Sequence, residues 1–333
     1  MRQGKRSISS RRSLLTSQDG VALIMVLWAL TILSVIVFSF SLMARTEVHS
    51  TASFRAVVAN RLLAEAGVER GVMEIAYRNT NRGQKVIIEG REIVEIDGRP
   101  YTGKIDKGQY TFRITDESGK IPLNALTESS GILLKNLITN MGYRPEDADT
   151  VLDSVLDWRD QDDLHRLHGA ESDYYMSLPS PYKAKNSAFD TVEELLLVKG
   201  VTPAMLYGDG QRKGIINFLT VYTETTSINV NAAPKEVLLA IPGMTQEAVD
   251  ALLTQRTATD IIKSTREVAG VPLGSLPGAS NYLSVADSNI FSIEATGNSE
   301  GGPKGYGIKA TVTLEAGSGH RYLYYKSPAQ VEP

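Results

Sequence analysis

A dense group of carboxylates is the part of this sequence best suited to chemistry. Residues 146–173 hold ten Asp and Glu side chains against two Arg, so the segment should repel itself unless solvent or a cation screens it. Ca²⁺ takes six to eight hard oxygen ligands at about 2.3–2.6 Å, and loop carboxylates at irregular spacing suit it. The candidate ligands follow the end of a predicted helix: Asp157, Asp160, Asp162, Asp163, Glu171 and Asp173. The sequence leaves two interpretations open, a calcium site or a solvated acidic loop.

The spacing of these acids does not make an EF-hand. Asp160, Asp162 and Glu171 fall at positions 1, 3 and 12 of an EF-hand count. Leu164 and His165 occupy positions 5 and 6, where that loop needs an oxygen ligand and a glycine. The EF-hand is therefore rejected, and any site must be irregular.

Composition excludes several other functions. The 333 residues include no cysteine, which removes disulfides, Cys-ligated zinc, iron–sulfur clusters and a thiol nucleophile. His165 and His168 have no third histidine nearby to complete a zinc site. No nucleophile-elbow or phosphate-loop glycine pattern is present, so we predict no enzyme. The net charge is −3, and residues 120–213 carry ten Lys and Arg against fifteen Asp and Glu, a field that repels nucleic acid.

The N-terminal residues that precede these features predict a membrane segment. Residues 1–19 contain five Lys and Arg against one acid, and residues 21–44 contain no charge at all. A helix over that stretch would be roughly 36 Å long, enough to cross a hydrocarbon core of about 30 Å. Because basic residues stay on the cytoplasmic side, the N-terminus should lie inside and the bulk of the protein outside.

The junction between the basic and apolar stretches resembles a prepilin-type leader. Gly20 directly precedes Val21, where the uncharged run begins. In the type IV pilin and pseudopilin families a dedicated peptidase cuts after such a glycine and methylates the new N-terminal residue, so the resemblance implies processing between Gly20 and Val21. A secretory signal peptide cut after Ser41 is an alternative, but its apolar region would be only about 7–15 residues. A plain single-pass anchor is the other alternative.

The fifth residue after the predicted cut departs from most pilin-like sequences. Those families usually carry a glutamate there, which is thought to pair with the terminal amine of the preceding subunit, and this chain has Met25. An unpaired carboxylate in hydrocarbon costs several kcal/mol. A subunit with no predecessor has no amine to offer it. Met25 therefore suits the first, or tip, subunit of a filament.

Beyond residue 45 the pattern predicts an α+β fold. The chain has no proline before Pro100, and apolar residues recur at helical spacing to about Tyr77, so the membrane helix should continue to there. Strand patterns follow at 85–89, 92–96 and 110–115, and again only at 290–295, 306–314 and 321–325. We predict a long N-terminal helix packed on one antiparallel sheet, as in pilins, with a large all-α helix-hairpin-type domain inserted between the sheet strands.

The inserted stretch contains a weak internal repeat. Residues 121–125 (Ile-Pro-Leu-Asn-Ala) resemble residues 228–232 (Ile-Asn-Val-Asn-Ala), and each copy leads into a helix, a turn containing Met and Gly, and a second helix. The turns are residues 141–143 and 241–244, and residues 198–201 form a third. Residues 241–244 are similar to the turn of helix-hairpin-helix DNA modules, but Thr245 replaces the second glycine. A packing motif fits better than DNA binding.

Several of these features together resemble the GspK family of minor pseudopilins of the type II secretion system. They are Gly20-Val21, Met25, Trp28 and residues 119–124, 191–201 and 228–234. Pro122, where the family usually has asparagine, and the long basic leader are departures. The resemblance implies the domains 1–20 (leader), 21–44 (membrane helix), 45–119 (pilin-like helix and first strands), 120–285 (inserted helical domain), 286–327 (completing strands) and 328–333 (tail).

The resemblance also implies a function. It predicts a non-enzymatic subunit at the tip of the pseudopilus, which initiates assembly and takes part in protein export across the outer membrane. Its partners would be the I-type and J-type minor pseudopilins, the major pseudopilin, the prepilin peptidase and the bacterial inner membrane, with one pass, a cytoplasmic N-terminus and a periplasmic bulk. Calcium is associated with the helical domain of this family. The rival hypothesis is a membrane-anchored exported module that binds DNA or protein.

Overall fold

The computed structural model describes residues 18–81, 94–258, 262–266, 276, 278–300, 305–315 and 319–331. The chain divides into two units, one ending at Val58 and one beginning at Ala59. The first unit consists, where described, of the N-terminal part of helix α1 (Gln18–Thr80). The second unit holds the rest of that helix, a five-stranded sheet and the inserted domain.

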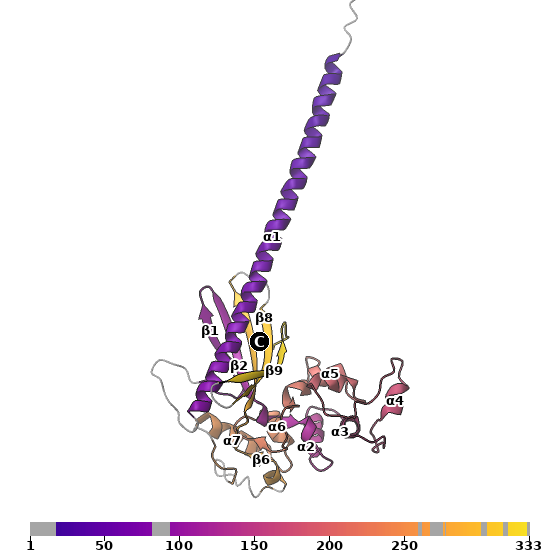
Figure 1. The fold of residues 1–333 in the computed structure, drawn as a ribbon, viewed down its shortest axis with the longest axis vertical. Coiled ribbons are helices and arrows are strands. Elements are labelled where there is room, and N and C mark those ends of the chain that lie inside the picture. The colour runs from indigo at the N-terminus through magenta and orange to yellow at the C-terminus, as the bar shows by residue number, and fades with distance from the viewer. Residues whose placement is uncertain are drawn as a thin grey trace, which may run out of the picture. The chain divides into compact units, whose positions relative to one another are not determined.

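Helix α1 changes character along its length, as the apolar pattern predicts. Between Gly20 and residue 50 every described side chain is exposed. In the second unit Ala64, Val68, Val72 and Ile75 are buried, at the spacing that places them on one helix face. This face packs on the sheet, and Figure 1 shows the C-terminal part of α1 lying across the strands.

The sheet is antiparallel throughout and has the strand order β1-β2-β7-β8-β9. Its strands are β1 (Tyr101–Ile105), β2 (Gly108–Asp116), β7 (Ile290–Ser299), β8 (Tyr306–Leu314) and β9 (His320–Lys326). The central pair β2 and β7 runs from Gly108↔Ser299 to Asp116↔Phe291. One sheet is therefore built from strands that precede and follow the insert, and the predicted α+β, pilin-like fold with an insertion between sheet strands is confirmed.

The strand predictions differ from the structure on one side of the sheet. The strands predicted at 110–115, 290–295, 306–314 and 321–325 are present in β2, β7, β8 and β9. The strand predicted at 85–89 and the first two residues of that at 92–96 lie outside the described residues, and residues 94–96 do not form the predicted strand. β1 was not predicted, because Gly103 interrupts its apolar alternation. A Cβ at Gly103 would lie 2.2 Å from the Tyr110 ring, so the missing side chain is what admits that ring.

Glycines also bring the helix close to the sheet. A Cβ at Gly297 in β7 would lie 2.1 Å from the backbone oxygen of Asn60, and one at Gly71 would lie 2.9 Å from Cγ2 of Ile293. Both distances are shorter than the van der Waals contact that a Cβ atom needs. The helix and sheet can therefore pack closely at these points only because no side chain separates them.

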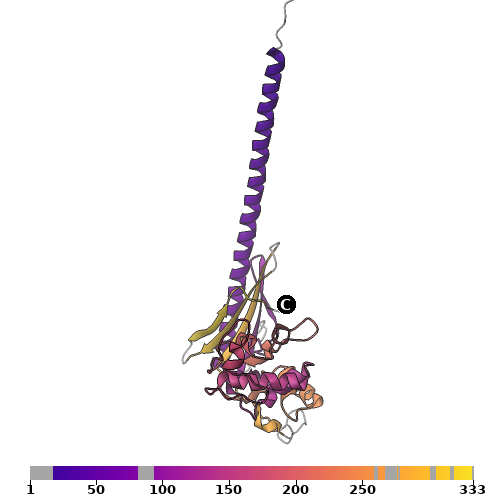
Figure 2. The same ribbon diagram turned by 90° about the vertical axis from the view of Figure 1, so that its right-hand side faces the viewer.

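The inserted domain has its own hydrophobic core, made of residues between Ile121 and Ala279. Its helices are α2 (Ile132–Asn140), α3 (Pro145–Arg159), α4 (Ser172–Met176), α5 (Pro203–Tyr207), α6 (Lys235–Ala240) and α7 (Gln246–Ala258), with short 3₁₀ turns between them. Figures 1 and 2 both show these helices grouped beyond one end of the sheet strands. The insert is not purely helical, because it also holds four two-residue strands, β3 (Ile121–Pro122), β4 (Leu219–Thr220), β5 (Ile228–Asn229) and β6 (Leu283–Ser284).

The internal repeat seen in the sequence is a structural repeat. In each copy a short strand pairs in parallel with a strand that returns later in the chain, β3 with β4 and β5 with β6. Each copy then forms a helix pair, α2 with α3 and α6 with α7. The first helices of the two copies contact each other, and Asn136 on α2 donates to the carbonyl of Ala240 on α6 over 2.9 Å.

An asparagine at the same place in each copy holds a distant segment of backbone. Asn124 accepts from the N–H of Phe189 at 2.8 Å and donates to its carbonyl at 3.0 Å. Asn231 makes the same pair of bonds to Ile262, at 2.8 and 3.0 Å. Each side-chain amide thus bonds to both the N–H and the C=O of one residue, as the backbone of a neighbouring strand would.

An arginine at the end of the second helix repeats in the same way. Arg159 donates to the carbonyls of Leu123 and Leu126. Arg256 donates to the carbonyls of Val230, at 3.2 Å, and Ala233, at 2.8 Å. These carbonyls lie at the same positions after β3 and β5 in the two copies. The arginine therefore joins the end of the second helix to the same backbone segment in both copies.

We expect Asn124→Ala and Asn231→Ala each to lower the free energy of unfolding by about 1–3 kcal/mol, because each leaves a buried backbone donor and acceptor unpaired. Asn140→Ala is the matched control, since this exposed side chain makes a single 3.2 Å bond to Leu239 and its loss should cost under about 0.5 kcal/mol. Urea denaturation of the purified protein measures all three. Equal losses in all three variants would contradict the role given to the repeated asparagines.

The chain leaves and re-enters the sheet through buried polar groups. Asp116, the last residue of β2, accepts from the backbone N–H of Ser118 at 2.8 Å and from the hydroxyl of Ser288 at 2.6 Å. The next residue, Glu117, lies 2.5 Å from the ammonium of Lys120 and accepts from Ser292 at 2.6 Å. These bonds tie the first and last residues of the insert to each other and to the sheet.

Candidate functional site

Three of the predicted metal ligands lie together at the end of α3. Asp157 is in the last turn of that helix, Asp160 is its C-cap, and Glu171 is the N-cap of α4. One carboxylate oxygen of each lies within 4.8 Å of the other two. In the part of the chain that the structure describes, this is the one group of three or more Asp, Glu or His side chains with that spacing.

The cluster is buried and short of hydrogen-bond partners. Asp157 is 0% and Glu171 is 1% exposed. Both carboxylate oxygens of Glu171, and Oδ1 of Asp160, are buried without a hydrogen-bond partner. Burial, and then the charges of Asp157, Asp160 and Asp163, raise the pKa of Glu171 to about 7. Buried oxygens without donors are costly to the folded protein unless a cation meets them.

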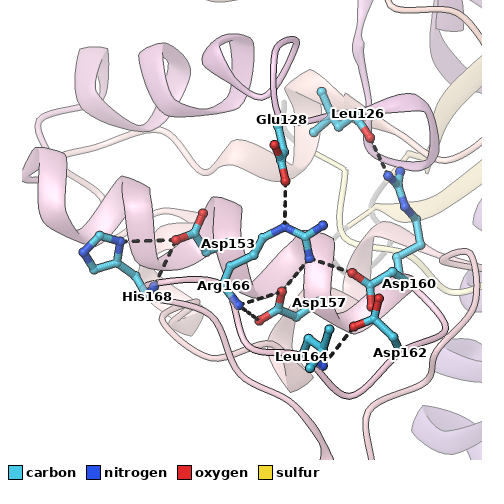
Figure 3. Close-up of polar contacts among 10 residues, drawn as sticks. Leu126, Glu128, Asp153, Asp157, Asp160, Asp162, Leu164, Arg166 and His168 are labelled. Atoms are coloured by element: carbon cyan, nitrogen blue, oxygen red, sulfur yellow. Dashed lines mark hydrogen bonds and ion pairs between the residues drawn. The ribbon is translucent and has the colours of Figure 1, made fainter.

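Arg166 is the positive group closest to this cluster (Figure 3). Its Nη1 lies 2.6 Å from Oδ1 of Asp157 and 2.6 Å from Oδ2 of Asp160. Its backbone N–H also points to both oxygens of Asp157, at 3.3 and 3.4 Å. Burial raises the pKa of Asp157, against the opposing effect of Arg166.

The other three predicted ligands lie apart from the cluster. Asp162 accepts from the backbone N–H of Leu164 at 2.9 Å. Asp173 is exposed and accepts from Tyr174 and from His165, whose Nε2 lies 3.0 Å away. Asp163 is exposed and acts on the cluster only through its charge. The structure thus brings together Asp157, Asp160 and Glu171 and leaves the other three candidates outside.

The donor set fits a hard divalent cation. It consists of carboxylate oxygens, three of which have no hydrogen-bond partner. Calcium binds such oxygens with a flexible coordination geometry, and water molecules complete its coordination shell. The neighbouring histidines are paired elsewhere, His168 to Asp153 and His165 to Asp173. A zinc site with imidazole ligands is therefore not what the described residues assemble.

Two residues that hold the cluster in place were not predicted from the sequence. A Cβ at Gly169 would lie 1.9 Å from Oδ2 of Asp157, so only glycine fits against that carboxylate. Lys199 donates to the carbonyls of His168 and Gly169, at 3.1 and 2.9 Å, and fixes the loop from the far side. Arg166 was also missed as a member of the site. The signal was present, because Gly169 lies two residues before Glu171 and Arg166 lies within the acidic run.

The second candidate site is the exposed face of α1. Among the helices of the described ranges, α1 alone is long and apolar enough to cross a membrane, with mean hydropathy 2.9 in its most apolar window. Gly20, Val21, Met25 and Trp28 all lie on this exposed helix. Met25 and Trp28 are three residues apart and so lie on neighbouring positions of one face. An uncharged face of this kind suits burial in lipid or against other apolar helices.

The fold and the N-terminal helix define a class of protein: a pilin-like subunit with one helix fit to anchor it in a membrane. Comparisons with known proteins narrow this class. Residues 119–207 match the family model described as type II secretion system (T2SS), protein K. The chain is 27% identical over 248 residues to type II secretion system protein K of Pseudomonas aeruginosa, covering 70% of this chain and 72% of that one. It is 26% identical over 193 residues to the same protein of Pectobacterium carotovorum, covering 50% and 57%.

A solved structure shows the same fold. The match is to a chain of the GspK-GspI-GspJ complex of the type 2 secretion system from enterotoxigenic Escherichia coli, with TM-score 0.51 and 16% identity, over 86% of this chain and all of that one. The resemblance to the GspK family predicted from the sequence is confirmed.

Proposed function

We propose that the protein is a non-enzymatic minor pseudopilin of a type II secretion system. The observation that carries the proposal is α1: one helix is uncharged and exposed from Val21 to Ala44, and its later turns form the core of a pilin-like sheet domain. This arrangement joins a membrane segment to a folded head without a linker. With the basic residues 1–19 on the cytoplasmic side, the helix crosses the inner membrane once and the head is periplasmic.

A position at the tip of the pseudopilus is supported by two features. Met25 leaves the fifth residue after Gly20 without a carboxylate, so it has no charge to pair with the amine of a preceding subunit. The insert adds more than 150 residues between β2 and β7, a bulk that would obstruct subunits stacked above it. The subunit would initiate assembly with I-type and J-type minor pseudopilins and join the major pseudopilin below; the solved structure with the same fold belongs to a complex of GspK, GspI and GspJ.

Processing at the predicted leader tests the proposal. We expect mass spectrometry of the membrane-extracted protein to give an N-terminus at methylated Val21. Gly20→Leu should abolish the cut, because a side chain at this position would block entry of the backbone into the peptidase, whereas Gly4→Leu in the leader should leave it unchanged. An intact Met1 in the wild-type protein, or a cut after Ser41, would instead support a plain anchor or a secreted product.

Antibody labelling along the length of assembled pseudopili, not only at their ends, would contradict the tip position.

The cluster of Asp157, Asp160 and Glu171 is proposed to bind Ca²⁺. The three carboxylates would supply the protein ligands, and the ion would screen their mutual repulsion in a domain that has no disulfide to stabilise it. A bound ion would thus strengthen the connection between the end of α3 and the start of α4. The role of the ion would be structural.

A further inference from the structure

The cation that meets the acidic cluster in this structure is a side chain of the protein itself. Nη1 of Arg166 lies 2.6 Å from one oxygen of Asp157 and 2.6 Å from one oxygen of Asp160. Short contacts between a guanidinium and two carboxylates are strong, charge-assisted hydrogen bonds. One positive charge therefore bridges two of the three carboxylates that would hold a metal ion, as Figure 3 shows for this pair.

The third carboxylate accepts no hydrogen bond from Arg166. Both oxygens of Glu171 are buried without a partner, although one of them lies within 4.8 Å of the candidate ligand oxygens of Asp157 and Asp160. A single guanidinium cannot match three carboxylates in charge. A divalent cation carries twice the charge of the guanidinium and accepts oxygens from all directions, so it can contact all three carboxylates.

The side chain of Arg166 lies at the edge of the cluster and is 27% exposed, while its backbone N–H is held by Asp157. Leu164 and Leu167, on either side of it in the chain, are 76% and 89% exposed, so their side chains do not hold the loop by packing. The Nε of Arg166 lies 3.7 Å from Oε1 of Glu128, a side chain that is itself 82% exposed. If the guanidinium leaves the two aspartates, the exposed carboxylate of Glu128 is close enough to pair with it.

We propose that Arg166 is a built-in counter-ion that competes with the metal ion for Asp157 and Asp160. This inference rests on the calcium site proposed above and adds what controls it. In the metal-free protein the guanidinium holds the end of α3 and the loop together. When a divalent cation binds, Arg166 leaves the two aspartates and turns to Glu128. The competition lowers the affinity for the ion and disfavours monovalent cations, which bring no more charge than the guanidinium they would replace.

Calcium titration of the full-length protein in detergent tests this competition. We expect Arg166→Gln to raise the Ca²⁺ affinity, measured by isothermal titration calorimetry, by about 10- to 100-fold, since each tenfold corresponds to about 1.4 kcal/mol. The same variant should melt at a lower temperature than wild type in EGTA. Glu128→Gln should lower the affinity, by about 2- to 5-fold on the same scale, because it removes the alternative partner. Arg212→Gln is the matched control, because this arginine pairs with Asp209 in an exposed site of the same domain.

The outcomes separate the two proposals. If wild type binds Ca²⁺ and Arg166→Gln binds it with equal or lower affinity while keeping its circular dichroism spectrum, the competition is wrong and the calcium site stands. If neither protein binds Ca²⁺, the calcium site is wrong and the competition falls with it. Arg166→Lys retains the charge but loses the forked donors, so an affinity between those of wild type and Arg166→Gln supports the competition even if the glutamine variant is unstable.

Discussion

Replacing Lys120 with methionine is expected to lower the free energy of unfolding by about 3–5 kcal/mol, because it leaves a buried carboxylate without its counter-charge. Glu117 is 1% and Lys120 8% exposed, and they lie 2.5 Å apart at the junction of the sheet and the insert. Burial alone would raise the pKa of Glu117, but the charge of Lys120 and its hydrogen bonds hold that pKa below the ordinary value of 4.5. Denaturant titration measures the loss.

The pH dependence of this effect follows from the direction of the pKa shift. A carboxyl whose pKa is lowered in the folded protein stabilises it above the unfolded pKa, and this contribution is lost as the pH falls through the folded pKa. The difference between wild type and Lys120→Met should therefore be largest near pH 7 and shrink in acid. Adding Glu117→Gln to Lys120→Met should recover part of the loss, because no buried charge then remains.

An exposed ion pair provides the control for the buried one. Lys235 and Asp250 lie 2.9 Å apart with about half of each side chain exposed. Lys235→Met should change the unfolding free energy by less than about 1 kcal/mol. If the two lysine variants lose similar stability, the junction is not the buried ionic contact that the structure shows.

Replacing Glu171 with glutamine is expected to change stability in opposite directions with and without calcium. In EGTA the variant should be more stable than wild type by about 1–3 kcal/mol, because it removes a buried charge that has no partner. In excess calcium the wild type should be the more stable protein. At a free ion concentration 100 times Kd, binding adds about 2.7 kcal/mol, and a variant that lacks one of the three ligands should lose most of this gain. Thermal melts in EGTA and in CaCl₂ measure both effects.

The metal-free protein should also respond to pH through this residue. The pKa of Glu171 is raised from 4.5 to about 7 in the folded protein. A carboxyl with a raised pKa binds its proton more tightly when folded, so stability falls as the pH rises from about 4.5 to 7 and is level above that. In Glu171→Gln this fall should be absent.

Asp173→Asn is the matched control for Glu171→Gln. Asp173 was predicted as a ligand from the sequence, but it lies outside the cluster, exposed and paired with His165. Its replacement should leave the stabilisation by calcium intact. If calcium changes the melting temperature of none of the three proteins, the metal site is wrong. If Asp173→Asn loses the response to calcium, the site has different ligands.

The candidate metal site was only partly predictable from its sequence. The acidic run was visible, but carboxylates close in sequence need not be close in space. Asp157 and Asp160 come together because they are three residues apart at the end of α3, which places them on one face, and Glu171 joins them only because the loop folds back and Gly169 lets it approach Asp157. Asp162, in the same loop, bonds to the backbone of Leu164, and Asp173, in the first turn of α4, pairs with His165.

The repeat explains why, in the described part of the insert, the acidic site belongs to one copy of the repeat. In the first copy Arg159 is the arginine at the end of the second helix, and Phe189 is the residue that the asparagine holds. Residues 160–188 lie between them. In the second copy the equivalent residues are Arg256 and Ile262, with only five residues between. The acidic loop is thus an extension of one copy of a repeated unit.

By itself the sequence determined the features that depend on neighbours along the chain. An uncharged run of 24 residues after a basic segment specifies a membrane helix, apolar spacing predicted that the helix continues to about Tyr77 but not that Ala64 and Val68 form its buried face, and alternation specified four of the five sheet strands. Only the tertiary structure decided that β2 pairs with β7 across the insert, that Arg166 bridges two aspartates, and that Glu117 is buried with Lys120. Such contacts join residues that local periodicity treats as unrelated, and their energies arise from burial, which exists only after the whole domain has folded.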